Sequence, residues 1–259
     1  METVLICIIA GMGAGLGTGF AGMSAAVVIS PMLVSFLGMN AFEAIGIALA
    51  SDVLASAASA YTYGKNKNID LKRSKSLFVS VLVFTLIGAF VAHLVPATTM
   101  GDFTVYGCVL MGINFLMKSF KDEAPKQHKE YTGIWKKLLP ILCGALIGFI
   151  CGFIGAGGGI MMLMLLTAVL HYELKTAVGT SVFIMTFTAL FGATSHFALN
   201  GVFPDVTVLL LCISSTLFFA TLGARFANKA QPKVLNRATG IVLLTLGVFM
   251  VASQYITAL

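Results

Sequence analysis

Residues 152–159 read Gly-Phe-Ile-Gly-Ala-Gly-Gly-Gly and interrupt an apolar run that extends over residues 138–171. A related stretch, Gly-Phe-Ala-Gly at residues 19–22, interrupts a second long run over residues 3–38. Each run has about 35 residues, whereas a helix crosses the hydrocarbon core of a bilayer with about 20. Glycine breaks helices because fixing its backbone costs the most conformational freedom. Each run is therefore predicted to fold as two half-helices, forming either a re-entrant hairpin or a pair of short spans.

The composition of the chain indicates a membrane protein. Of its 259 residues, 58% are hydrophobic and only 10% are charged, whereas soluble domains have near 25% charged residues. So few charges cannot cover the surface of a soluble protein of this length. The alternating ten-residue pattern of membrane β-strands is absent, so the sequence predicts an all-α integral membrane protein. The other apolar runs cover residues 42–63, 76–95, 101–118, 176–199, 206–227 and 234–258.

The two glycine-interrupted runs indicate an internal duplication, since 152 − 19 = 133 and the same offset pairs Gly11 with Gly144. Self-similarity at one fixed spacing is the mark of a repeated structural unit. We predict a first membrane repeat at residues 1–118, a basic cytoplasmic linker at 119–137, and a second membrane repeat at 138–259. Each pseudo-symmetric repeat is predicted to hold a glycine-broken first segment followed by three transmembrane helices.

Basic residues form three clusters near membrane ends, and such clusters mark the cytoplasmic side. They lie at residues 65–75, 118–137 and 225–237, whereas the opposite connections carry Asp102 and Asp205. All three clusters reach the cytoplasm only if each repeat crosses an odd number of times, which the broken segments allow. The repeats are then inverted relative to each other, as in many secondary transporters. The net charge of +6 accordingly indicates topology in a multi-pass cell (inner) membrane protein rather than nucleic-acid binding.

The glycine-rich breaks are candidate anion sites. A half-helix that starts at a break directs its free N–H groups and the positive end of its dipole toward that point. Close packing of helices through small residues is the alternative interpretation. The candidate binding residues at the two breaks are Gly22, Ser24, Gly155, Gly157, Gly158 and Gly159.

Thr180 and Ser181 are a second group of candidate binding residues, because they open an apolar run with two adjacent hydroxyls. Such hydroxyls can donate to an anion, or they can bond back to the backbone of their own helix. Asp52 lies inside the apolar run 42–63, and an acid within a membrane segment is a functional residue by default. We consider Asp52 and His196 as proton-coupling groups. The alternative for Asp52 is a neutral acid that is hydrogen-bonded to Ser51 or Ser56.

Motifs of other protein classes are missing from the sequence. There is no Walker loop and no His-Glu-x-x-His motif, so an ATP-driven pump in one chain is excluded. The five cysteines lie inside apolar runs without metal-ligand spacing and are interpreted as buried thiols. We expect neither a cofactor nor a metal. An intramembrane enzyme is disfavoured because no nucleophile–base pair is evident.

Residues 152–162 and 177–181 together resemble the second-repeat signature of the TauE/SafE sulfite exporter family, and residues 20–33 are similar to a weakened first copy. The resemblance covers essentially the whole chain. It implies a membrane permease for sulfite, sulfonates, sulfoacetate or other organic anions. Gly155, Gly157, Gly158, Thr180 and Ser181 would line the anion path by that resemblance. The first copy departs from the family at residues 24–26, where Ser-Ala-Ala replaces the usual glycines.

We therefore predict a secondary transporter that binds a small, sulfur-containing or organic anion at the glycine-rich breaks and moves it by alternating access. An anion channel built from the same residues is one alternative, and a non-transporting accessory membrane subunit is another. The expected partners are the small anion and the lipid bilayer, without nucleic acid. Assembly into a homo-oligomer is left open.

Overall fold

The computed structural model describes residues 2–95, 134–154, 158–200 and 204–230, together with five single residues beyond them. Within these ranges the regular structure is entirely α-helical. The predicted apolar run at 101–118, nearly all of the predicted linker and most of the last apolar run lie outside the described residues. The described helices are α1 (Glu2–Ala21), α2 (Ala26–Leu37), α3 (Ala41–Lys65), α4 (Leu71–His93), α6 (Trp135–Ile154), α7 (Gly158–Ala168), α8 (Leu174–Asn200) and α9 (Val206–Lys229).

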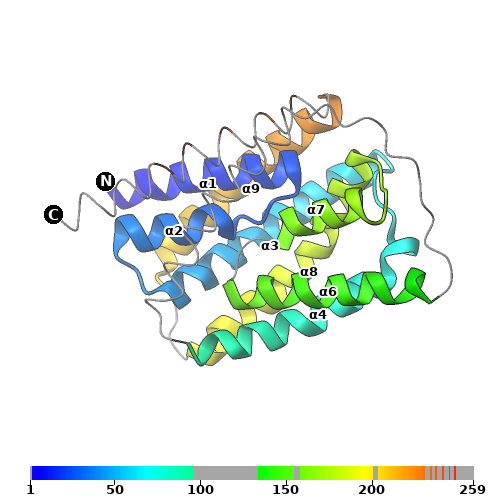
Figure 1. The fold of residues 1–259 in the computed structure, drawn as a ribbon. Helices are drawn as coiled ribbons and strands as arrows, with labels where there is room; N and C mark the ends of the chain where they lie inside the picture. The colour runs from blue at the N-terminus through cyan, green and yellow to red at the C-terminus, as the bar shows by residue number, and fades with distance from the viewer. Residues whose placement is uncertain are drawn as a thin grey trace.

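Five of the described helices, α1, α3, α4, α8 and α9, are long and apolar enough to cross a membrane. In contrast, α2 has 12 residues, which at 1.5 Å per residue is about 18 Å and too short to span the core. Figure 1 shows α2 doubling back along α1, so that the end of α2 lies near the start of α1. The first long apolar run is thus a spanning-length helix followed by a returning half-helix.

Polar residues at the membrane edges define where the long helices begin. The side chain of Asn40 accepts a hydrogen bond from the Phe42 N–H (2.9 Å) at the start of α3. Asp70 and Asp205 do the same at the starts of α4 and α9. Side-chain oxygens at this position satisfy N–H groups that have no partner within the helix. These caps stop each helix close to the end of its apolar run.

Glycines bring two pairs of helices into close contact. Gly11, Gly15 and Gly19 of α1 pack in ascending order against α9, and Gly144, Gly148 and Gly152 of α6 pack in the same way against α4. A methyl group at Gly15 would lie 2.5 Å from the Thr216 carbonyl oxygen of α9. Both pairs are therefore parallel and nearly in backbone contact, as is common for glycines spaced four apart in membrane helices.

Helices α3 and α8 cross antiparallel at the centre of the bundle, where Gly46 meets Phe197 and Gly192 meets Leu49. In Figure 1, α1 runs inward from the N-terminal end of the bundle, whereas α6 runs inward from the opposite end. That opposite end gathers the α3–α4 turn, the start of α8 and the end of α9: Asn68 Nδ2 donates to Asn228 Oδ1 (3.1 Å), and Lys175 Nζ donates to the Asn228 carbonyl (2.6 Å).

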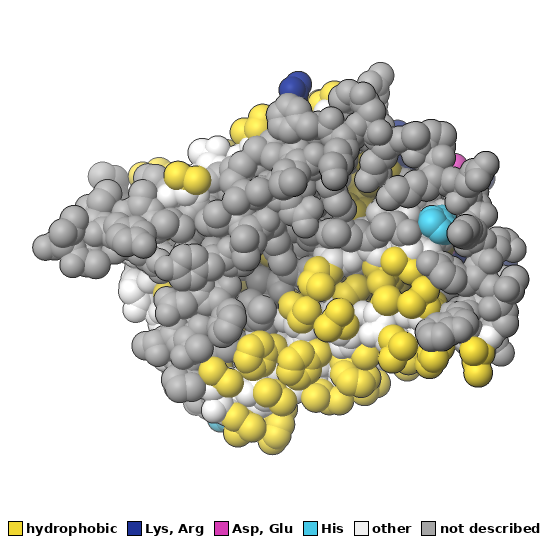
Figure 2. Space-filling model, in the orientation of Figure 1, with side chains coloured by type: hydrophobic (Ala, Val, Ile, Leu, Met, Phe, Trp, Pro, Cys, Tyr) yellow, Lys and Arg dark blue, Asp and Glu magenta, His cyan; other side chains and the backbone are white. Residues whose placement is uncertain are grey.

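The outer surface of the bundle is apolar along its length. Side chains exposed there include Val79, Val83 and Phe90 of α4 and Leu142 and Leu146 of α6. Figure 2 shows a broad hydrophobic band over the lower part of the molecule, where Figure 1 places α4 and α6. A continuous apolar surface of this kind is suited to lipid rather than to water.

Candidate functional site

Gly22 ends α1 in a left-handed conformation, with φ +61°. Its N–H donates to the Thr18 carbonyl (3.0 Å), which closes the helix with a left-handed C-terminal cap. A side chain at Gly22 would also collide with Ser181 Oγ of α8, and its Cβ would lie 3.3 Å from the Val178 carbonyl. Both the backbone angle and the space therefore require glycine here.

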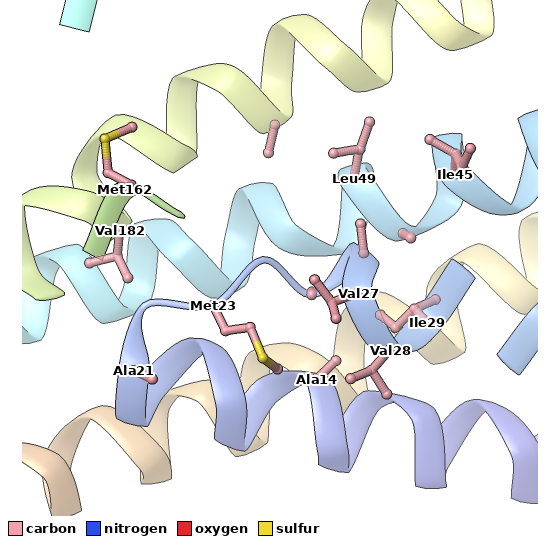
Figure 3. Close-up of a cluster of buried hydrophobic side chains, with 14 of the residues drawn as sticks. Ala14, Ala21, Met23, Val27, Val28, Ile29, Ile45, Leu49, Met162 and Val182 are labelled. Carbon is pink, nitrogen blue, oxygen red and sulfur yellow. The ribbon is translucent and has the colours of Figure 1, made fainter. Parts of the chain in front are cut away.

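The segment between Gly22 and α2 crosses the middle of the bundle as buried, non-helical chain. Met23 folds back against Gly17 of α1, as Figure 3 shows from the direction of its side chain. In the same view Met162 of α7 and Val182 of α8 lie on the other side of this segment. The first predicted interruption is thus a crossing point of α1, α2, α7 and α8.

Asp52 of α3 is 1% exposed and points at this crossing. Ser24 Oγ donates to Asp52 Oδ2 (2.8 Å), and Ser56 Oγ donates to Asp52 Oδ1 (2.8 Å). The backbone of Ala25 makes a further hydrogen bond to the carboxylate. Ser51 instead bonds back to the Ile47 carbonyl (2.9 Å), so of the two expected partners only Ser56 contacts Asp52. The acid therefore lies at the N-terminal end of α2.

The start of α7 meets the same crossing from the other side. A methyl group at Gly159 would collide with the Gly22 carbonyl oxygen and would lie 2.9 Å from the Ser24 nitrogen. Gly158 faces elsewhere, since its methyl would lie 2.9 Å from Cys151 Sγ of α6. Gly155 and Gly157 lie outside the described residues, which include only the two edges of the second interruption, at Ile154 and Gly158.

The two hydroxyls at the start of α8 have separate surroundings. Ser181 Oγ lies at Gly22 and donates to the Val178 carbonyl (2.9 Å). Thr180 Oγ1 accepts a hydrogen bond from the Asp70 N–H (3.0 Å), so it fixes the α3–α4 turn at the end of the bundle. Of the predicted binding residues, the structure brings Gly22, Ser24, Gly159 and Ser181 together around Asp52 and directs Thr180 away from them.

His196 of α8 is 4% exposed and lies away from the crossing, with its Nε2 3.3 Å from the Gly152 carbonyl. Sequence reasoning missed two residues at the crossing. Met185 has its sulfur beside Gly159, and Ser59 has a buried hydroxyl for which the described residues supply no partner. The offset of 133 could have revealed Met185, because it pairs 185 with Asp52. Ser59 follows Asp52 by seven residues, which is two helical turns.

Replacing Gly22 with alanine is expected to destabilise the protein far more than replacing Gly38, which has φ +62° and no atom within 4 Å of an added methyl. The left-handed backbone alone costs a non-glycine residue about 1–2 kcal/mol, and this cost is common to both variants. Gly22→Ala adds overpacking against α8, worth about 1–3 kcal/mol. Thermal unfolding in detergent would measure the difference. Equal melting temperatures for the two variants would contradict the tight crossing described above.

The described residues hold no group of three or more His, Cys, Asp and Glu side chains that could bind a metal. What they hold is a buried acid, two hydroxyls and bare glycine backbone at a helix interruption, inside a bundle with an apolar exterior. Non-helical backbone at membrane depth is tolerated where it is buried in protein or lines a cavity. Irregular backbone next to a buried acid is the arrangement found in multi-pass membrane transporters.

The comparisons with known proteins agree with that class. The sulfite exporter TauE/SafE family profile matches residues 7–250, and the chain belongs to this family. It is 25% identical to the probable membrane transporter protein YunE of Bacillus subtilis over 94% of this chain and 95% of the relative. It is 26% identical to the probable membrane transporter protein MJ0441 of Methanocaldococcus jannaschii over 80% and 78% of the two chains. No solved structure gives a significant match.

Proposed function

We propose that this chain is a secondary transporter for a small, sulfur-containing or organic anion such as sulfite or a sulfonate. The printed description of the family, sulfite exporter, supports that substrate class. The observation that carries the proposal is the meeting of two half-helix starts, α2 and α7, at one buried crossing with bare backbone between them. The N–H groups and the dipole of such a start favour negative charge.

The two half-helix starts differ in charge, and the difference favours α7 as the anion site. The start of α2 already has a negative group, because Ser24 Oγ and the Ala25 backbone bind the Asp52 carboxylate. The offset of 133 residues places Met185 at the corresponding position, and the Met185 sulfur lies beside Gly159 at the start of α7. An anion at α7 would therefore take the place that Asp52 takes at α2.

We further propose an inverted duplication, with repeats at residues 1–118 and 138–259 and a linker at 119–137. The helix contacts support it. The offset relates α1 to α6 and α3 to α8, and an offset of 135 residues relates α4 to α9. The parallel, glycine-mediated pair α1 with α9 thus has its counterpart in α6 with α4. The antiparallel pair α3 with α8 is its own counterpart, as expected for a two-fold axis in the membrane plane.

The basic residues support one orientation in the cell (inner) membrane. Those of the described helices and turns gather at the end where α3 and α9 stop and α4 and α8 start, and we propose that this end faces the cytoplasm. The opposite end has Glu43, whose Oε1 accepts from the Asp205 N–H (3.3 Å). The basic residues of that end are Lys65, Lys67, Lys72, Arg73, Lys75, Lys175, Arg225 and Lys229.

Cysteines at Lys65, Lys229 and Val206 are expected to report this topology in a background without the native cysteines. All three side chains are exposed. A membrane-impermeant maleimide should label Lys65→Cys and Lys229→Cys only from the cytoplasmic side, because both positions lie at the basic end. Val206→Cys should label only from the other side. Labelling of Lys229→Cys from outside alone would show that the two halves have the same orientation.

We assign proton coupling to Asp52 rather than His196. Asp52 hydrogen-bonds to the residues of the first interruption, so a change in its charge acts directly on the crossing. His196 contacts a backbone carbonyl instead. An acid that gains and loses a proton at the crossing would couple the half-helix α2 to a proton gradient.

Counterflow in proteoliposomes tests the transporter against its rivals. Vesicles loaded with unlabelled sulfite, thiosulfate or an alkyl sulfonate are diluted into a trace of the same labelled anion. A transporter that works by alternating access gives a transient accumulation that saturates with concentration. An anion channel gives equilibration without that transient, and an accessory subunit gives no flux when it is purified alone.

A further inference from the structure

We infer that Tyr63 and His196 are paired positioning residues, which hold the ends of α1 and α6 at the two interruptions. This inference rests on the proposed role of the interruptions in anion transport. Neither residue touches the crossing through its polar group. Each binds one backbone carbonyl near the end of a helix, and each therefore fixes the point at which that helix stops.

The α1 contact satisfies a carbonyl that the helix leaves without a partner. The last carbonyls of a helix lack N–H donors from a following turn. At the end of α1, the Gly22 N–H bonds to Thr18 and the Met23 N–H bonds to Gly17, so neither bonds to Gly19. Tyr63 Oη donates to the Gly19 carbonyl (3.1 Å) from α3, and Tyr63 is 1% exposed. The end of α1 is thereby tied to α3, eleven residues beyond Asp52.

The α6 contact has the same form. The Nε2 atom of His196 lies 3.3 Å from the Gly152 carbonyl, two residues before α6 ends, just as Gly19 lies two residues before α1 ends. The offset relates both members of the two contacts, since 63 + 133 = 196 and 19 + 133 = 152. A tyrosine and a histidine share no shape, but each offers one hydrogen-bond donor at the end of a ring. The donated hydrogen bond is therefore the feature that the two halves have in common.

For His196 this role requires a hydrogen on Nε2, which the neutral ring can carry. The nearest titratable neighbour among the described residues is His93, whose ring packs against the same phenylalanine, Phe42, as that of His196. The position facing His196 from α6 is a carbonyl rather than an acid. A positioning residue of this kind acts through a hydrogen bond and not through a change of charge. Transport should therefore keep its pH dependence when the donor is preserved.

Hydrogen exchange on the substrate-free protein tests the positioning role without reference to transport. Tyr63→Phe should raise amide exchange at residues 22–26 about five-fold, the change expected for one lost hydrogen bond, and should leave residues 158–161 unchanged. His196→Leu should do the reverse. Tyr61→Phe is the matched control, since Tyr61 is 76% exposed on the same helix. A general rise at both sites, or no rise at either, would overturn the inference.

Transport then separates positioning from proton transfer. His196→Gln keeps an N–H donor, so it should restore the KM that His196→Leu raises and should keep the wild-type pH profile of sulfite or sulfonate counterflow. Loss of the pH profile in His196→Gln would show that His196 carries the proton, and it would overturn the assignment. If the wild-type protein moves none of these anions, the proposed function fails, while the exchange experiment still decides whether the two residues position the helix ends.

Discussion

Replacing Met185 with aspartate is expected to abolish anion transport, whereas replacing it with asparagine should leave most of it. Met185 lies beside Gly159 at the start of α7, in the place that corresponds to Asp52 at the start of α2. An aspartate there would present its own carboxylate to the N–H groups proposed to bind the substrate. It would also repel the substrate, because two like charges 4 Å apart interact by about 4 kcal/mol at an effective dielectric constant of 20.

The expected loss is therefore about 100- to 1000-fold in the apparent affinity of counterflow, since each 1.4 kcal/mol is tenfold. Aspartate and asparagine have nearly the same size, so the pair of variants isolates the charge from the cost of burying a polar side chain. Size-exclusion chromatography and thermal unfolding would show that both variants fold. If Met185→Asp and Met185→Asn transport equally well, the anion does not bind at the start of α7.

Replacing Asp52 with asparagine is expected to uncouple transport from the proton gradient without stopping exchange. Asparagine keeps an oxygen that can accept from Ser24 or Ser56, but it cannot take up and release a proton. A gradient of one pH unit stores about 1.4 kcal/mol per proton, so the wild-type protein should accumulate a monovalent anion about ten-fold with one proton. Asp52→Asn should reach only the equilibrium level, while its counterflow stays within a few-fold of wild type.

Asp205→Asn is the matched control for this experiment. Asp205 is an exposed acid that caps α9 through the Thr207 N–H (2.8 Å), and asparagine caps helices equally well. The control should therefore keep both accumulation and counterflow. Gradient-driven accumulation in Asp52→Asn at the wild-type level would remove Asp52 from the coupling mechanism.

The sequence predicted the helical membrane fold and the first interruption well, because both depend on local properties. The glycine that ends α1 is Gly22, inside the predicted break. The burial of Asp52 also followed from its apolar neighbours, and Ser56 was named as a partner because four residues separate neighbours on one helix face. Residues 96–133 and 155–157, which include two of the predicted glycines, lie outside the described residues.

The sequence could not predict how the candidate site residues divide. Thr180 and Ser181 are adjacent in sequence, and they were expected to act together. In the structure Thr180 binds the backbone at Asp70 while Ser181 lies at Gly22, because consecutive residues point to different sides of a helix. Which side faces the crossing depends on how α8 packs, and that packing involves helices far away in the chain.

By itself, then, the sequence determined the membrane class, the duplication and the place where α1 stops, since hydropathy and glycine act over a few neighbouring residues. Only the tertiary structure decided that Ser24 reaches Asp52 across 28 residues and that the start of α7 meets Met185 rather than an acid. The physical reason is that a half-helix ending inside a bundle has its free N–H groups and carbonyls satisfied by whichever helices cross it. Those crossings are set by the close approach of glycines on α1 and α6 to remote partners.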